Sequence, residues 1–137
     1  MSIHRLLKAL LKIKTCEKFP VEVLQTITAR CNLNCRYCIY PMIKSEMTTQ
    51  QIKRAIKEFA EEGTLSWTIS GGEPLLRTDL KEIIMFAKDC GISRVKVLTN
   101  GLLFKQKLET LKKADEIAFS LDGPKEIHDK IRGKNSC

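Results

Sequence analysis

The chain has 137 residues, of which 43% are hydrophobic and 29% are charged, and its formal net charge is +8. This size allows one domain with a hydrophobic core, and this composition excludes a disordered chain. No apolar run approaches the roughly 20 residues that cross a bilayer, and the first 14 residues lack the features of a secretory signal, so we expect a cytoplasmic location without membrane association. The basic residues are scattered and are not interleaved with aromatic ones, so no nucleic-acid partner is expected.

Residues 1–20 are predicted to form a basic amphipathic helical region. From Ser2 to about Lys14, apolar residues share one helical stripe and basic residues lie off it. The stripe contains Ile3, Leu6, Leu7, Leu10 and Leu11. We favour docking of this stripe on the protein's own core over a membrane surface or a partner.

Residues 21–137 are predicted to form an α/β domain in which strands and helices alternate. The expected strands are 21–28, 65–70, a stretch around Val95 and Val97, and 117–121. A helix begins at Thr48, where Gln51 completes a capping box, and ends at Gly63. A second helix runs from 78 or 79 to Gly91, and the spacing of Phe104, Leu108 and Leu111 predicts a third.

The alternation of short strands with helices predicts right-handed βαβ units and a parallel sheet. The strands are rich in apolar residues, which is typical of burial on both faces of such a sheet. In a parallel βα array the loops that follow the strands share one edge, where ligands bind. Residues directly after each strand are therefore expected to lie together.

The loop after the first strand carries three of the six cysteines in the chain: Cys31, Cys35 and Cys38. In a reducing compartment such a cluster indicates metal binding rather than disulfides. A structural zinc site requires four protein ligands, and an electron-transfer [4Fe–4S] cluster is normally held by four cysteines. Three thiolates leave one iron open for a small molecule. Cys16, Cys90 and Cys137 lack motif spacing, and we expect Cys90 to be a small buried residue.

The other strand ends carry unusual residues as well. Gly71-Gly72-Glu73-Pro74 follows the second strand, Thr99-Asn100-Gly101 follows the third, and Ser120 and Asp122 end the fourth. Glycine allows the backbone to approach a ligand closely. An ordinary turn remains the alternative at each of these places.

With these motifs in this order, the chain resembles the radical S-adenosylmethionine (SAM) superfamily. The pattern C-x3-C-x2-C, with the aromatic Tyr37 before the last cysteine, is that superfamily's signature, and Gly71-Gly72-Glu73 resembles its GGE motif. The stretch from His128 to Gly133 resembles the branch that contains the molybdenum-cofactor enzyme MoaA and the SPASM-type peptide maturases. The resemblance implies a partial parallel (β/α) barrel, of which about four βα units are present here, preceded by the amphipathic helix.

The resemblance also implies two cofactors, a [4Fe–4S] cluster and SAM. Cys31, Cys35 and Cys38 would hold the cluster, and SAM would bind the open iron and yield a 5′-deoxyadenosyl radical that abstracts a substrate hydrogen. Tyr37 would lie by the adenine, unless it packs on the core. The remaining implied SAM-binding residues are Gly71, Gly72, Glu73, Thr99, Asn100, Ser120, Asp122 and Arg132. For Arg132 a solvated helix end is an equal alternative, and His128 is expected to be a structural or surface residue rather than a base.

The resemblance implies a one-electron donor such as flavodoxin or ferredoxin, and a peptide or small-metabolite substrate. Only four strands are predicted, whereas the family core has six. Three explanations stay open: an N-terminal fragment, completion of the barrel by a second chain or a second copy, or a degenerate form. The alternative function is a non-catalytic iron–sulfur binding or electron-transfer module.

Overall fold

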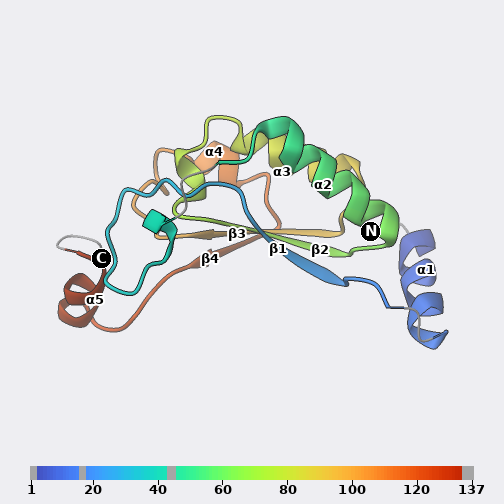
Figure 1. Ribbon diagram of the computed structural model, residues 1–137, viewed down its shortest axis with the longest axis horizontal. Helices are drawn as coiled ribbons and strands as arrows, with labels where there is room; N and C mark the ends of the chain where they lie inside the picture. The colour runs from blue at the N-terminus through green and yellow to red at the C-terminus, as the bar shows by residue number, and fades with distance from the viewer. Residues whose placement is uncertain (1–2, 16–17, 43–45, 134–137) are drawn as a thin grey trace.

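The computed structural model describes residues 3–15, 18–42 and 46–133, so Cys16 and Cys137 lie outside the described residues. Figure 1 shows a sheet with helices packed over one face. The strands are β1 (Glu22–Thr26), β2 (Ser66–Ser70), β3 (Arg94–Thr99) and β4 (Glu116–Phe119). The helices are α1 (Ile3–Lys14), α2 (Thr49–Glu62), α3 (Leu80–Asp89), α4 (Leu108–Leu111) and α5 (Lys125–Arg132), and two 3-10 turns are η1 (Tyr40–Met42) and η2 (Pro74–Leu76).

The strands form one parallel sheet in the order β1-β2-β3-β4, which confirms the predicted parallel α/β fold. Thr26 at the end of β1 pairs with Ser70 at the end of β2. Thr99 at the end of β3 pairs with Phe119 at the end of β4. This register brings the carboxyl ends of all four strands to one edge of the sheet. The residues directly after each strand therefore lie at the same edge, as predicted.

Local sequence signals fix the longest helix. Thr48 caps α2, because its side chain accepts from the Gln51 N–H while the Gln51 side chain accepts from the Thr48 N–H. Gly63 ends the helix in the left-handed region with φ of 106°, and its N–H bonds carbonyls of the last turn. A β-carbon is disfavoured at that φ, so glycine suits this position. The predicted capping box and helix stop are confirmed.

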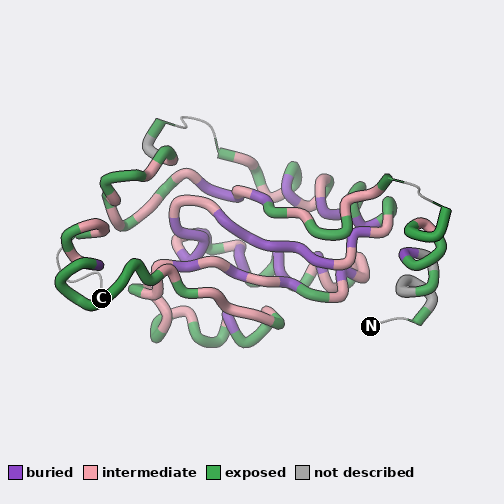
Figure 2. The backbone as a smooth tube through the Cα atoms, turned by 90° about the horizontal axis from the view of Figure 1, so that it is seen from below, coloured by how far each residue is buried: buried purple, intermediate pink, exposed green. Residues whose placement is uncertain are grey.

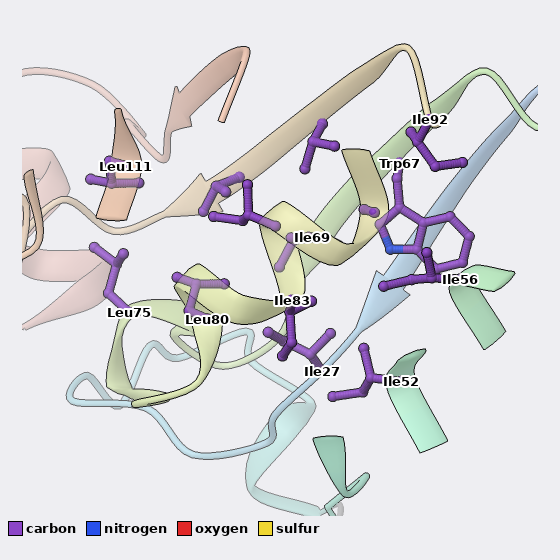
Figure 3. Close-up of a cluster of buried hydrophobic side chains, with 14 of the residues drawn as sticks. Ile27, Ile52, Ile56, Trp67, Ile69, Leu75, Leu80, Ile83, Ile92 and Leu111 are labelled. Carbon is purple, nitrogen blue, oxygen red and sulfur yellow. The ribbon is translucent and has the colours of Figure 1, made fainter. Parts of the chain in front are cut away.

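The hydrophobic core lies between the sheet and helices α2, α3 and α4. Trp67 and Ile69 of β2 are fully buried and share this core with Ile56 of α2 and Ile83 of α3 (Figure 3). The indole of Trp67 also contacts the ring of Phe59, with centroids 5.7 Å apart. These contacts hold the strand ends, and therefore the site edge, in a fixed register.

The opposite face of the sheet carries charged residues and is partly exposed, so the prediction of burial on both faces is wrong for most of the sheet. Only β2 is buried along its whole length, whereas β3 alternates (Figure 2). On the second face, Arg94 lies within 4.0 Å of Glu22 and 3.8 Å of Glu116, and Lys96 lies 2.8 Å from Glu116. The helices cover one face only, so charged residues face outward on the other.

The predicted third helix is shorter than its spacing indicated. Residues 102–107 form turns, and α4 begins only at Leu108. In this segment the N–H of Phe104 bonds the carbonyl of Gly101, three residues back, and the Phe104 ring packs edge-on against Phe119 at 5.4 Å. The side chain thus reaches the core from a turn rather than from a helix.

The described residues of the apolar stripe of helix α1 are exposed. Leu7, Leu10 and Leu11 are all about half exposed or more, while Ala9 is buried. The described contacts include the Lys12 ammonium, which donates to the carbonyl of Glu62 at the end of α2. The expected docking of the stripe on the core is therefore wrong for these leucines, which lie outside the hydrophobic cluster of the sheet and its helices. Among the described residues, no helix is long and apolar enough to cross a membrane.

Candidate functional site

A cavity of about 210 Å³ opens at the carboxyl edge of the sheet. The loop after β1 lies there beside α5, at the end of the molecule opposite α1 (Figure 1). All the predicted site residues except Glu73 and Asp122 line this cavity. They are Cys31, Cys35, Tyr37, Cys38, Gly71, Gly72, Thr99, Asn100, Ser120 and Arg132. One pocket therefore receives residues from the ends of all four strands.

The three cysteines are half-buried on one wall of the cavity. The N–H of Leu33 donates to Cys31 Sγ over 3.4 Å, and the N–H of Cys38 bonds the carbonyl of Cys35 at 3.1 Å. Burial raises the pKa of the Cys35 thiol; the charge of Arg132 opposes this rise, and the sulfurs of Cys31 and Cys38 add to it. Cys31 and Cys38 are thus close enough to Cys35 for their charges to act on its thiol.

The donor set fits an iron–sulfur cluster better than a single ion. In the part of the chain that the structure describes, no three His, Cys, Asp or Glu side chains form a group that could hold one metal ion. A cubane cluster binds each cysteine through a separate iron, so its ligands need not converge on one atom. Cys31, Cys35 and Cys38 face one cavity and thus fit three corners of such a cluster.

The glycine pair after β2 brings backbone to the cavity wall. The N–H of Gly72 bonds the carbonyl of Thr28, and the N–H of Glu73 bonds the carbonyl of Arg30, both at 2.8 Å. A Cβ on Gly71, which has φ of 153°, would lie 2.4 Å from the Thr28 oxygen, and a Cβ on Gly72 would lie 2.4 Å from the Arg30 oxygen. Only glycine permits this close pairing of the cysteine loop with the β2 end.

Glu73 is fully buried and ties two loops together. Its Oε1 accepts from the N–H of Leu75 at 3.0 Å and from the hydroxyl of Thr99 at 2.9 Å. Its Oε2 accepts from the N–H of Asn100 at 2.8 Å. A buried carboxylate is stable when such donors surround it. Glu73 therefore fixes the β3 end relative to the glycine turn and does not itself line the cavity.

Tyr37, Asp122 and Arg132 form a cluster between the cysteine loop and α5. Arg132 donates through Nε and Nη2 to the two carboxylate oxygens of Asp122, and its guanidinium lies 5.7 Å from the centroid of the Tyr37 ring. The Tyr37 hydroxyl donates to Asp122 at 3.4 Å. The hydrogen bonds and charge of Arg132 hold the pKa of Asp122 below its usual value. The arginine is thus oriented and is not a freely solvated helix end.

His128 is buried and contacts this cluster through the backbone of Asp122. Its Nδ1 accepts from the N–H of Asp122 at 3.3 Å. That His128 is a structural or surface residue rather than a base stays a prediction. The N–H of Arg36 donates to the carbonyl of Ile131 at 3.1 Å, which joins the cysteine loop directly to α5. Cys90 is half-buried, packs against the core at the end of α3 and does not line the cavity, whereas it was expected to be a small buried residue.

Sequence reasoning missed the residue that closes the cysteine loop at its base. Arg77 is 7% exposed, and its Nη1 donates to the carbonyls of Ile27 and Met47, at the start and the end of the loop, each at 2.9 Å. The same nitrogen reaches Glu46 at 3.1 Å, and the guanidinium makes a two-point ion pair with Asp79 at 2.8 and 2.6 Å. We call this group of five residues the loop neck.

Four further lining residues were also missed: Leu33, Tyr40, Ser70 and Leu98. Ser70 and Leu98 lie in β2 and β3 directly before the predicted motifs. Since ligands bind at the carboxyl ends of parallel strands, these two residues could have been predicted as well. Tyr40 lies in η1, where its hydroxyl is 3.3 Å from the Thr26 hydroxyl, and no sequence signal marks it.

The fold and cavity define an α/β protein whose cysteine loop faces the carboxyl edge of a parallel sheet, and the family comparison agrees. The model of the radical SAM superfamily matches residues 26–136. The chain belongs to the radical SAM superfamily. Membership of this family implies a [4Fe–4S] cluster and SAM as cofactors.

Curated relatives support the same assignment. The chain is 39% identical over 104 residues to a GTP 3′,8-cyclase of Aquifex aeolicus, and these residues cover 69% of this chain and 32% of that protein. It is 36% identical over 128 residues to a PqqA peptide cyclase of Bradyrhizobium diazoefficiens, covering 87% of this chain and 34% of that one. The chain therefore spans about a third of the length of the curated relatives it matches.

Solved structures share the fold. Streptococcus suis SuiB bound to S-adenosylmethionine superposes with a TM-score of 0.70 at 24% identity, covering 93% of this chain and 30% of that one. The structure titled anSMEcpe with bound AdoMet gives a TM-score of 0.67 at 26% identity, covering 85% and 36%. These likenesses confirm the partial radical SAM (β/α) barrel that the sequence predicted.

Proposed function

We propose that this chain supplies the cluster-binding and SAM-binding part of a radical SAM enzyme. The observation that carries the proposal is the single cavity in which the three cysteines meet the glycine turn and the ends of β3 and β4. Cys31, Cys35 and Cys38 bind three irons of a [4Fe–4S] cluster and leave the fourth iron for SAM. When bound, the cluster would supply the electron, taken from a flavodoxin- or ferredoxin-like donor, for reductive cleavage of the SAM sulfonium to methionine and a 5′-deoxyadenosyl radical, which would take a substrate hydrogen.

The residues around the cavity suit the two ends of SAM. The peptide groups of Gly71 and Gly72 lie on the wall nearest the cysteine loop and are proposed to receive its amino group. Arg132 supplies a fixed positive charge for a carboxylate, because Asp122 and the Tyr37 ring orient its guanidinium. Ser120, at the end of β4, offers a hydroxyl for the ribose or the methionine part.

Glu73 and Asp122, which do not line the cavity, are proposed to position residues that do. Glu73 holds the backbone of Asn100 through a 2.8 Å hydrogen bond, and Thr99 through its hydroxyl. Asp122 holds Arg132. The proposal therefore keeps all predicted SAM-site residues, with Glu73 and Asp122 acting through neighbours that line the cavity.

The proposed substrate is a peptide or a small metabolite. The curated relatives support both classes of substrate, since one is named for GTP and another for the PqqA peptide. One solved neighbour is titled as bound to a precursor peptide. We place substrate binding outside the cysteine cavity, which the two cofactors would fill.

Activity is proposed to require a further strand-bearing partner. Within the described residues β4 pairs with β3 alone, and Phe119 and Leu121 near its end are exposed. An unpaired strand edge is a template for pairing. A second chain, or further chain joined to this one, would cover that edge and complete the barrel. The four-stranded sheet is also what favours the second candidate function, an iron–sulfur or electron-transfer module without radical chemistry.

An anaerobic reconstitution separates these functions. The protein is loaded with iron and sulfide, and SAM and dithionite are added; 5′-deoxyadenosine is then measured. Product supports the radical SAM assignment. Because turnover is proposed to require a further partner, an intact cluster without product refutes only turnover by this chain alone, and a cluster EPR spectrum that SAM leaves unchanged supports the electron-transfer module. Cys35→Ala is expected to lose the cluster absorbance and iron content. Cys90→Ala is the matched control, because this half-buried cysteine packs against the core and does not line the cavity. Equal iron in both variants would refute the ligand assignment.

A further inference from the structure

The side-chain amide of Asn100 has a fixed orientation. Its Oδ1 accepts from the N–H of Leu102 at 3.0 Å, so this atom faces the turn after β3. The two Nδ2 hydrogens therefore face the cysteine loop. There Nδ2 lies 2.8 Å from Asn32 Oδ1 and 3.9 Å from Cys31 Sγ. The donor assignment follows from the Leu102 N–H, which can only donate.

The backbone of Asn100 is anchored as firmly as its side chain. Its N–H donates to the buried carboxylate of Glu73 at 2.8 Å, and the hydroxyl of Thr99 donates to the same carboxylate at 2.9 Å. That hydroxyl in turn accepts from the N–H of Gly101 at 3.1 Å. The amide is thus presented to the cysteine loop from a rigid strand end rather than from a mobile side chain.

Cys31 is the cysteine that receives these donors. Its sulfur accepts from the N–H of Leu33 at 3.4 Å in addition to the Asn100 amide at 3.9 Å. Among the described residues, neither Cys35 nor Cys38 has a comparable N–H donor on its sulfur. The trio is therefore asymmetric, with hydrogen bonding concentrated on the first cysteine.

We propose that Asn100 is a positioning residue that raises the reduction potential of the cluster through its hydrogen bond to the Cys31 sulfur. The inference rests on the proposed cluster binding. Reduction adds negative charge to the cluster and its thiolates, and an N–H donor stabilises that charge, so hydrogen bonds to the sulfurs shift the potential upward. The Cys31 sulfur becomes a stronger acceptor as a thiolate than it is as a thiol.

Asn32 fixes the second hydrogen of the same amide. Its Oδ1 accepts from Asn100 and also lies 4.0 Å from Cys31 Sγ. An amide nitrogen carries two hydrogens, so one can bond the oxygen while the other is directed to the sulfur. Asn32, the residue next to Cys31, thereby keeps the Asn100 amide directed at the Cys31 sulfur.

The test is a reduction potential of the reconstituted protein, measured by an EPR-monitored redox titration without SAM. Asn100→Asp keeps an oxygen for the Leu102 N–H but removes the donor hydrogens, and Asn100→Leu removes them without adding a charge. Both variants are expected to lower the ratio of reduced to oxidised cluster about tenfold at a fixed solution potential, which equals a shift of about 59 mV to more negative values. Asn34→Leu is the matched control, because Asn34 is exposed in the same loop and is expected to leave the potential unchanged.

The outcomes separate this inference from the proposed function. Iron and sulfide content, measured first, tests cluster binding; a protein without a cluster overturns both. With clusters intact, a wild-type potential in both Asn100 variants overturns the tuning role and leaves the cluster assignment standing. An equal shift in Asn34→Leu also overturns it, since the effect would then belong to the loop in general. If Asn100→Leu assembles no cluster, Asn100→Ala, which also removes the donor hydrogens without adding a charge, decides in its place.

Discussion

Arg77→Leu is expected to be the most damaging single change outside the cavity. The guanidinium joins Ile27 and Met47, at the two ends of the cysteine loop, and pairs with Glu46 and Asp79. Leucine fills much of the same volume but leaves two carbonyls without this donor and leaves Asp79, whose side chain is 18% exposed, without its cation. Loss of one partner from a buried pair costs about 3–5 kcal/mol in the free energy of unfolding.

The matched control is Arg30→Leu, because Arg30 pairs with the same Glu46 from the protein surface. The Arg30 side chain is 61% exposed, whereas that of Arg77 is 7% exposed. Exposed pairs contribute about 0–1 kcal/mol. Arg77→Lys keeps the positive charge but not the planar set of guanidinium donors. We therefore expect its loss of unfolding free energy to lie between the losses of the two leucine variants.

The assay is urea unfolding of the cluster-free protein, followed by far-ultraviolet circular dichroism. A domain of this size has an unfolding free energy of about 5–15 kcal/mol, so the variant is expected to remain folded at low urea with a lower midpoint. Iron content after reconstitution is expected to fall too, because the cysteine loop loses its closure. Costs for Arg77→Leu and Arg30→Leu within about 1 kcal/mol of each other would refute the loop neck as a stabilising device.

Three further outcomes follow from the site. Gly72→Ala is expected to reduce iron retention severalfold, because the new Cβ would lie 2.4 Å from the Arg30 carbonyl; iron content checks this. Glu73→Gln is expected to cost about 1–3 kcal/mol in urea unfolding, because one carboxylate oxygen becomes a donor facing other donors. Hydrogen bonds from Arg77 lower the pKa of Asp79 below its ordinary 3.8, so its stabilising contribution is complete above that pH and lost as the pH falls through the lowered value. Unfolding measured against pH should lose this acid dependence in Arg77→Leu.

The features that the sequence predicted well are local ones. Thr48 and Gly63 bound α2 because capping involves only residues within a turn of each other. The strand ends could be located because Gly71 and Ser120 directly follow β2 and β4, and Thr99 is the last residue of β3. Parallel topology then brought these ends together without knowledge of any side-chain contact. The family resemblance added roles to the same residues.

The features that the sequence could not predict depend on distant partners. Tyr37 and Asp122 are 85 positions apart, and only the folded chain shows that they share Arg132. The spacing of Phe104 from Leu108 and Leu111 predicted that it lies in a helix. Phe104 instead lies in a turn, where its ring packs against Phe119, a residue distant in the sequence. The predicted docking of the α1 stripe on the core was wrong for a related reason. Periodicity predicts an apolar face on a helix but does not predict which element, if any, covers that face.

The position of β2 in the sheet explains why the loop after it holds the site together. In the order β1-β2-β3-β4 this strand has β1 on one side and β3 on the other, so residues 71–79 reach both neighbouring loops. Gly72 bonds Thr28 on the cysteine loop, Glu73 bonds Asn100 after β3, and Arg77 closes the loop neck. A change in any of the three should therefore move the cysteines relative to the β3 end, and the cluster potential should respond to Glu73→Gln as it does to loss of the Asn100 donor.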